Sequence, residues 1–330
     1  MPDTMADVVL RSEARLARSL TGYPFTGALD AQQESEILER IAPLCEGGRF
    51  ALLPLAALSS QRKALLIEER LLPIKPAQNE RESMAIALDR ENSAAVMING
   101  EEHLCFHAVR PGLRLQEAMD CVLTEERLFA RDLMFAFDRQ FGYLNGAFAD
   151  VGTGLRLTAA LHLPYMEKAK RAEAELKALQ GHVVSAKMPL GSVYLVLNGA
   201  TIGVTEEEIA LSVAGAARRL AKEERQAREK ALLENPEEIP TELSCMREML
   251  FSDDSLSEKD CMLNWSFLRQ AVTAGALPRK LEEVDALLTA SSPGHLDAAA
   301  GRTLEADERG AYRLQIFRDF LGAEPPERRA

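Results

Sequence analysis

The chain has 330 residues, of which 47% are hydrophobic and 27% charged, a balance typical of a soluble globular protein with one or two sizeable cores. Its formal net charge of −12 argues against a broad surface for nucleic acid or for an anionic membrane. The sequence shows no signal-peptide core, no apolar run of membrane-spanning length and no C-x-x-C among its five cysteines, so we expect a cytoplasmic protein with reduced thiols.

Hydrophobic periodicity predicts a mixture of helices and strands in the first two thirds of the chain. In chain order we expect a helix at 31–45, a segment of either type at 64–72, strands at 83–88, 93–99 and 101–110, a helix at 113–133, a strand at 154–164, a helix at 165–180, a strand at 191–203 and a helix at 205–235. Thr205, followed three residues later by Glu208, predicts a capping box at the start of the last of these helices.

The pattern changes after the segment 230–242, which is the best candidate for a domain boundary. Beyond it only helical spacing occurs, at 243–251, 257–273, 280–290 and 305–321. Strands mixed with helices, followed by helices alone, indicate an α+β domain at 1–235 joined to an all-helical domain at 236–330.

Three short stretches carry residue types that could do chemistry. The turn "GTG" at 152–154 precedes Arg156, a weak signal for a phosphate-binding loop, and "RSEARLAR" at 11–18 is either a solvated basic stretch or part of an anion site. His103 and His107 share one face of a strand, but no third ligand is evident, so we expect no metal site.

Taken together and in order, several segments resemble the ATP:guanidino phosphotransferases, the phosphagen kinase family, and within it the bacterial protein-arginine kinases. They are "VVLRSEARLARSLTGYPF" (8–25), "ENSAAVMINGEEHL" (91–104), "FAFDRQFGYLNGAFADVGTGLRLTAALHLP" (135–164), "GSVYLVLNGATIGVTEEEI" (191–209) and "SSPGHLDAAAGRTLEADERGAYRLQIFRDFL" (291–321). The resemblance implies a glutamine-synthetase-like catalytic domain, with a large antiparallel sheet flanked by helices, and a C-terminal helical domain for phosphoarginine docking and dimerisation.

The resemblance also implies what the site would contain. Enzymes of this family transfer the γ-phosphate of ATP, with magnesium, to a guanidinium nitrogen. Arginines clamp the triphosphate and carboxylates orient the guanidinium, so the residue type at each of these positions decides activity.

Only part of this set is kept here. The resemblance places Glu101 at the catalytic carboxylate, and Arg15, Arg18, His103 and Arg156 at nucleotide or phosphate positions. The replaced positions are Glu13, Cys105 and Gln180, where the family has three of its five phosphate-binding arginines. Ser185 and Met188 stand at the two glutamates of the fourth motif, so that the second catalytic glutamate is lost. Ala147 stands at the reactive cysteine and Asp150 at an asparagine.

The helical domain resembles a phosphoarginine-docking domain through Arg309 and Arg313. The two arginines are four residues apart and therefore share one helix face. Gly310 stands where the family has an aspartate that would hold the guanidinium of the ligand, and a solvated helix face is the alternative interpretation.

From these replacements we expect a catalytically impaired pseudokinase that acts as a binding or regulatory module. Its expected partners are proteins, either an arginine-containing substrate, an active paralogue or a quality-control adaptor, and we expect a homodimer that contacts neither nucleic acid nor membrane. The alternative is an active, divergent protein-arginine kinase in which Arg11, Arg70 or Lys187 supplies a missing cation; ATP and magnesium would be its cofactors if nucleotide binding is retained.

Overall fold

The computed structural model describes residues 4–45, 50–78, 80–89, 94–179, 183–189 and 191–322. The strands are β1 (Val9–Arg18), β2 (Phe50–Pro54), β3 (Ala85–Asp89), β4 (Ala94–Ile98), β5 (Leu104–Pro111), β6 (Phe137–Asp138), β7 (Gly142–Tyr143), β8 (Leu155–His162), β9 (Val183–Lys187) and β10 (Val193–Asn198). The helices are α1 (Ala31–Cys45), α2 (Ser60–Glu68), α3 (Ile74–Gln78), α4 (Leu115–Phe129), α5 (Pro164–Lys168), α6 (Ala172–Lys177), α7 (Glu206–Glu234), α8 (Glu238–Ser252), α9 (Glu258–Thr273), α10 (Leu281–Ala290), α11 (Pro293–Ala300) and α12 (Ala306–Leu321).

A large antiparallel sheet organises the first part of the molecule. Its eight strands run in the order β2-β3-β4-β5-β1-β8-β10-β9, so β1 lies between β5 and β8 although it comes first in the chain. Arg15 of β1 is paired with His107 on β5 and with Arg156 on β8. This register brings residues from three distant parts of the sequence onto neighbouring positions of one sheet face.

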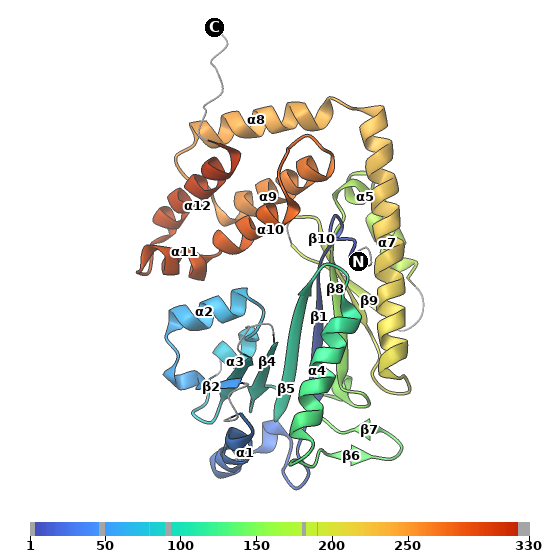
Figure 1. The fold of residues 1–330 in the computed structure, drawn as a ribbon, viewed down its shortest axis with the longest axis vertical. Helices are drawn as coiled ribbons and strands as arrows, with labels where there is room; N and C mark the ends of the chain where they lie inside the picture. The colour runs from blue at the N-terminus through green and yellow to red at the C-terminus, as the bar shows by residue number, and fades with distance from the viewer. Residues whose placement is uncertain are drawn as a thin grey trace.

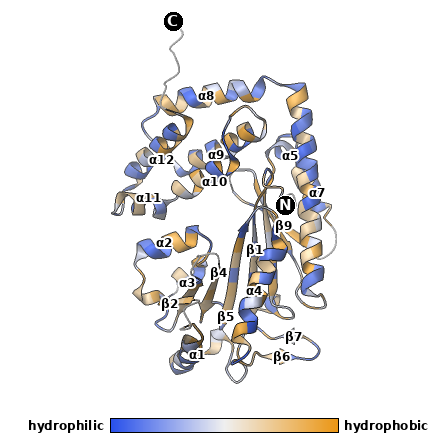
Figure 2. Ribbon diagram, in the orientation of Figure 1, coloured by the Kyte–Doolittle hydropathy of each residue, from blue (hydrophilic) through white to orange (hydrophobic). Residues whose placement is uncertain are grey.

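One face of the sheet carries the main hydrophobic core. Alternate residues of the central strands, such as Leu16, Phe106 and Leu157, are buried there together with apolar residues of α1, α4 and α7. Along α7 hydrophobic and hydrophilic residues alternate, as expected for a helix with one side on the sheet (Figure 2). The opposite face of the same strands is therefore left for other contacts.

That opposite face carries two apolar clusters. Met97 and Cys105 pack with α2 and the segment that follows it, whereas Val193 packs with the helices of the C-terminal part. Trp265 of α9, the single tryptophan of the chain, is buried in this second cluster, and its ring lies 5.5 Å from that of His162 at the end of β8. A strip of charged side chains from β1 and β8 lies on the same face.

The C-terminal helices α8 to α12 form one group at the end of α7, on the far side of the molecule from β6 and β7 (Figure 1). This group also contacts α2. The Glu68 carboxylate accepts hydrogen bonds from the backbone N–H groups of Gly294, at 2.7 Å, and His295, at 3.1 Å, at the start of α11. Gly294 is needed there because a Cβ atom would lie 2.9 Å from that of Ala64.

The structure confirms the mixed fold class, with its large antiparallel sheet and C-terminal helices. It also confirms the capping box of Thr205 and Glu208 at the start of α7, and Ser257 caps α9. The strand predictions at 83–88, 93–99, 101–110, 154–164 and 191–203 correspond to β3, β4, β5, β8 and β10, although part of the turn between β3 and β4 lies outside the described residues.

One helix prediction was wrong in detail. The helix expected at 165–180 is broken into α5 and α6, because Lys170 adopts a left-handed backbone conformation with φ 56° between them. The basic stretch at 11–18 is strand β1 in the centre of the sheet, and the segment 64–72 is largely helical through α2. Periodicity had also not indicated β2, α3, β9 or α11.

Candidate active site

The alternation of β1 separates its charged residues onto two faces. Arg11, Glu13 and Arg15 point to the charged strip, whereas Arg18, three residues after Arg15, points to the opposite side. The guanidinium of Arg18 is buried: it donates to Glu126 of α4 at 2.9 Å and lies 3.5 Å from the ring centroid of Tyr143. Arg18 is thus a structural cation beside the main core, and we do not count it among the cations of the candidate site.

Five side chains of alternating charge form a continuous chain across the strip, which we call the charge chain: Lys75, Glu101, Arg15, Asp150 and Arg156. Its shortest contacts are both made by Asp150, which accepts from Arg15 Nη1 at 2.7 Å and from Arg156 Nε at 2.8 Å. Glu101 lies 3.4 Å from Arg15 Nη2 and 3.5 Å from Lys75 Nζ. Arg15 and Arg156, two of the three arginines that the resemblance placed at nucleotide or phosphate positions, are therefore bound to one carboxylate.

The ion pairs of Asp150 are stronger than those of Glu101 because Asp150 is more deeply buried. The side chain of Asp150 is 5% exposed, that of Arg15 19% and that of Glu101 41%. Ion pairs that are shielded from solvent are screened less by water and salt. Asp150 thus offsets one of the two positive charges of Arg15 and Arg156, while the Glu101 carboxylate remains half open to solvent.

The loop that carries Asp150 is held in place on both sides. Glu102, which is fully buried, accepts hydrogen bonds from the N–H groups of Gly146 and Ala147 at 2.9 and 2.8 Å. On the other side, Thr201 Oγ1 lies within hydrogen-bond distance of the carbonyls of Ala149 and Val151. Because the backbone around Asp150 is fixed by these contacts, its carboxylate is directed at the arginines.

The "GTG" turn follows directly and is dictated by close packing. Gly152 and Gly154 have φ values of +106° and +65°, and added Cβ atoms would lie 2.1 Å from the carbonyl oxygen of Thr201 and 2.6 Å from that of Ala17. Only glycine fits such positions without moving the neighbouring backbone. The glycines are therefore required by the fold, whatever the site binds.

The surroundings of Arg15 shift the pKa values of the strip. Burial on its own would lower the pKa of Arg15, but Cys105 and the carboxylates of Asp150 and Glu101 raise it above its ordinary value. Burial raises the pKa of the Cys105 thiol to about 12 and lowers the pKa of His107 to about 3, and the charge of Arg15 also disfavours protonation of His107. At neutral pH we therefore expect a thiol at Cys105 and a neutral ring at His107, neither of which supplies the positive charge of an arginine.

Glu13 has its own cationic partners on the strip. Its carboxylate pairs with Arg11, and Arg70, just after α2, is close enough for both charges to affect it. Burial and the charge of Arg11 lower the pKa of Arg70, and Glu13 opposes this effect. Arg11 and Arg70 are thus placed beside a carboxylate and not beside an open anion site.

The remaining sequence candidates lie elsewhere. His103 is buried before β5, where its Nδ1 accepts from the N–H of Leu20 and its Nε2 lies 2.9 Å from the carbonyl of Pro24. On β9, Ser185 and Lys187 are on the sheet face opposite to Arg15, and Lys187 pairs with Glu167. Gln180 lies outside the described residues.

The cations of the strip that would face the triphosphate of ATP lie beside carboxylates. Arg15 and Arg156, the cations kept at phosphate positions, both bind Asp150, and Glu13 places a further negative charge on the same strip. Within the described part of the chain, no group of three or more histidine, cysteine or acidic residues could hold a metal ion.

Arg309 and Arg313 come together in the C-terminal part, on one side of α12. Both line a cavity of about 480 Å³ that also includes Gly310 and the start of α9. Asp297 of α11 binds Arg309 through two contacts of 3.0 and 2.8 Å, while Arg313 is buried and donates to the carbonyl of Ser291. The first arginine therefore already has a carboxylate partner.

Sequence reasoning missed two of the ion-pair partners in the charge chain, Asp150 and Lys75. Asp150 had been noticed as a replacement for asparagine, but not as the partner of Arg15 and Arg156; Lys75, on the unexpected helix α3, had not been noticed at all. An acidic residue gained in a segment that keeps its arginine is the signal that could have revealed the first. Nothing local in the sequence marks Lys75.

Two family models match the chain. Residues 33–227 match "ATP:guanido phosphotransferase, C-terminal catalytic domain", and residues 247–330 match "Protein-arginine kinase McsB C-terminal domain". The protein-arginine kinase of Listeria welshimeri is 31% identical, with 96% of this chain and 94% of that protein covered. The protein-arginine kinase of Symbiobacterium thermophilum is 30% identical, with the same two shares covered.

Solved structures support the fold. The duplicated taurocyamine kinase from Schistosoma mansoni, solved with bound transition state analog components, matches with a TM-score of 0.61 at 17% identity over 69% of this chain. The chain spans about a third (34%) of the length of that duplicated protein. Lombricine kinase matches with a TM-score of 0.57 at 18% identity, over 67% of each chain.

Proposed function

Because the chain belongs to the ATP:guanido phosphotransferase family, we propose that it is a catalytically impaired relative of the protein-arginine kinases, one that acts as a binding or regulatory module. One observation carries this proposal: Asp150 holds Arg15 and Arg156 at 2.7 and 2.8 Å, where the family's chemistry needs cations free to bind phosphate. A carboxylate in that place repels a triphosphate and already accepts one hydrogen bond from each guanidinium group.

The charge chain supports the proposal at its other end as well. Lys75 Nζ lies 3.5 Å from Glu101, the carboxylate that the family resemblance assigns to the substrate guanidinium. An internal cation therefore competes for the position of the guanidinium, and an internal anion for that of the phosphate. Phosphoryl transfer depends on positioning and on electrostatic stabilisation of the moving group, so both contacts act against it.

We also propose a division into a catalytic-domain homologue at 1–235 and a helical domain at 236–330. The partners of such a module are proteins, and the candidates are an arginine-containing protein, an active paralogue or a quality-control adaptor. Arg309 and Arg313 beside one cavity favour phosphoarginine as a ligand of the helical domain. No helix of the described chain is long and apolar enough to span a bilayer.

The proposal is tested by incubating the full chain with Mg-ATP and an arginine-rich protein, and by measuring phosphoarginine with mass spectrometry. We expect no phosphoarginine above that made by a Glu101→Gln variant. Robust phosphoarginine that disappears in Glu101→Gln would show an active enzyme and overturn the proposal. Binding of phosphoarginine, compared with the Arg309→Ala variant, tests the helical domain separately.

A second function, active protein-arginine phosphorylation, is favoured by one feature. Glu101 is 41% exposed, and its contacts to Arg15 and Lys75 are the two longest of the charge chain. A substrate guanidinium could displace Lys75, whose side chain is 81% exposed, at little cost. The same phosphoarginine assay distinguishes the two functions.

A further inference from the structure

The β6–β7 hairpin lies at the end of the sheet that is away from the C-terminal helices (Figure 1). Six of the thirteen exposed large hydrophobic residues of the described chain lie there: Phe25, Met134, Phe137, Phe141, Phe148 and Ile202. Hydrogen bonds join their segments, from Thr21 N to the carbonyl of Met134 and from Thr153 N to that of Thr201. Exposed apolar surface gathered in one place indicates a contact surface.

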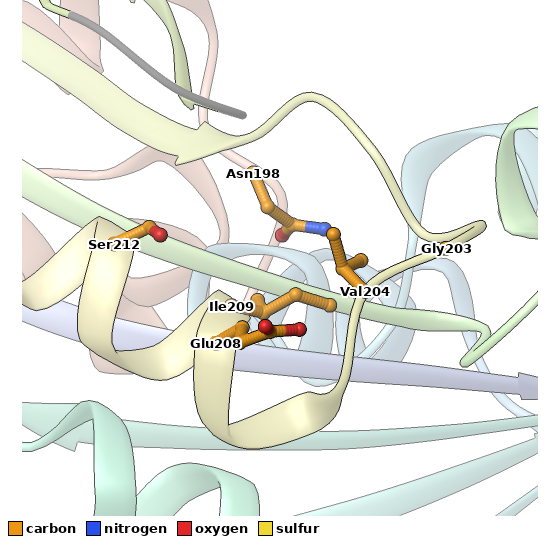
Figure 3. A pocket seen from close by; sticks show the side chains of 6 residues that line it. All are labelled: Asn198, Gly203, Val204, Glu208, Ile209 and Ser212. Carbon is orange, nitrogen blue, oxygen red and sulfur yellow. The ribbon is translucent and has the colours of Figure 1, made fainter.

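A groove runs through this surface, between the β6–β7 hairpin and the first turn of α7. We call it the hairpin groove, and it is lined by Phe137, Phe141, Tyr143, Val204, Glu206 and Glu208. It has a volume of about 340 Å³ and adjoins a second hollow of about 210 Å³, with which it shares Val204 and Glu208. Figure 3 shows this second hollow, with the Glu208 carboxylate beneath the loop of Gly203 and Val204.

The lining of the hairpin groove combines exposed aromatic rings with carboxylates. The rings of Phe137 and Phe141 are 60% and 48% exposed, and Phe137 packs edge-on against Tyr143 with 5.3 Å between ring centroids. No arginine or lysine is among the described residues that line the two hollows. Among the residues that the structure describes, none pairs with or hydrogen-bonds to the side chain of Glu206, whereas the side chain of Glu208 caps α7.

From these observations we propose that the hairpin groove binds an extended segment of a partner polypeptide through an arginine side chain flanked by apolar residues. The guanidinium stacks on the exposed phenyl rings and pairs with Glu206, while its apolar neighbours cover Met134 and Ile202. Arginine suits this site better than lysine because its planar group stacks on aromatic rings and is less strongly hydrated. The inference rests on the proposed function, in that it names the class of protein that the module recognises.

The hairpin groove adjoins the loop that carries Asp150. Gly152 and Thr153 line it, and Thr201, which holds Ala149 and Val151 in place, lines it too. A segment bound there would contact the loop of Asp150 from the side away from Arg15. The two sites are neighbours with different chemistry, and variants can affect them one at a time.

The test uses a fluorescein-labelled peptide with one arginine between leucines, titrated with the full chain and followed by fluorescence anisotropy. Matched peptides carry glutamine or lysine in place of the arginine. We expect the arginine peptide to bind about fivefold or more tightly than the glutamine peptide, and the lysine peptide to lie between them.

Groove variants test where the peptide binds. Glu206→Gln should weaken binding of the arginine peptide about threefold, and the double change Phe137→Ser with Phe141→Ser about tenfold. Both phenylalanines are exposed, so the fold should survive, and circular dichroism checks this. Leu233→Ser is the matched control because Leu233 is 85% exposed at the far end of α7, and it should bind as the unchanged chain does.

Several outcomes would overturn the inference. One is equal binding of the glutamine and arginine peptides; another is unchanged affinity in both groove variants. Loss of binding in Glu101→Gln but not in the groove variants would place the arginine on the catalytic face instead. A dimer that the phenylalanine variant dissociates in light scattering would show that a second copy covers the groove. The phosphoarginine assay is independent, so failure of the proposed function would be recognised separately.

Discussion

Replacing Asp150 by asparagine tests the electrostatic argument most directly. The change keeps the size and the backbone contacts of the residue but removes the negative charge between Arg15 and Arg156. At an effective dielectric constant of about 20, two unit charges about 4 Å apart interact by about 4 kcal/mol. Because Arg15 and Arg156 remain partly exposed, solvent reduces this repulsion, and we expect about 2 kcal/mol of added affinity for a phosphate anion, roughly a 30-fold lower Kd.

Isothermal titration with pyrophosphate and with ADP measures this gain. Thermal unfolding gives a second readout, because Asp150→Asn leaves two guanidinium groups without their carboxylate and should lower Tm in the absence of phosphate. Added phosphate should recover that loss in the variant and have little effect on the unchanged chain.

Asp120→Asn is the matched control, since it removes the same charge from an exposed position on α4. If Asp150→Asn binds pyrophosphate no better than the unchanged chain, or if Asp120→Asn gains as much, then Asp150 does not block the arginines. In that case the argument that the site neutralises itself fails, whatever the kinase assay shows.

Three further changes probe other parts of the molecule. Burial raises the pKa of Asp7, but hydrogen bonds from two arginines of α7 outweigh it and lower the pKa to about 2, from an ordinary value of 3.8. The ionised carboxylate therefore stabilises the fold above about pH 4, and this stabilisation is lost as the pH falls towards 2. Asp7→Asn should then lower the free energy of unfolding by about 2 kcal/mol at pH 7 but hardly at pH 2, as urea titrations at the two pH values would show. Gly310→Asp should destabilise the fold by about 1–3 kcal/mol, because its Cβ would lie 2.0 Å from Ser255 Oγ. A second change, Ser255→Gly, removes that oxygen and should recover much of the lost stability in thermal melts. Equal melting temperatures of the single and double variants would contradict this explanation. Glu68→Ala should remove the cap of α11 at a cost of about 1 kcal/mol, and hydrogen exchange should then accelerate at the start of α11 and not in α9.

The parts of the fold that could be predicted from the sequence are those fixed by local patterns. The capping box of Thr205 and the period of α7 depend on residues within one or two turns of each other, so they are visible in the sequence. Strand β1 was harder, because three of its side chains on the site face are charged, and only its place between β5 and β8 explains why they are tolerated there. The break at Lys170 arises from tertiary packing that overrides helix propensity.

The candidate site shows the same limit. The resemblance to the kinase family implies that Arg15, Glu101 and Arg156 share one site, and the structure brings them into one charge chain. Spacing could not show that Arg18 points to the other face of the sheet, or that Lys75 reaches Glu101 from α3. These relations depend on strand register and on contacts between distant segments, neither of which is written in any single stretch of sequence.

The burial of Trp265 has a practical consequence for all these experiments. The chain has this one tryptophan, and it lies where α9 packs against the end of β8 and beside Gly191, which precedes β10. Its ultraviolet emission therefore comes from the seam between the sheet and the C-terminal helices. If the helices separate from the sheet while far-ultraviolet circular dichroism stays constant, water reaches the indole and the emission shifts to the red. The protein thus carries its own optical probe for distinguishing the opening of this seam from unfolding of the whole chain.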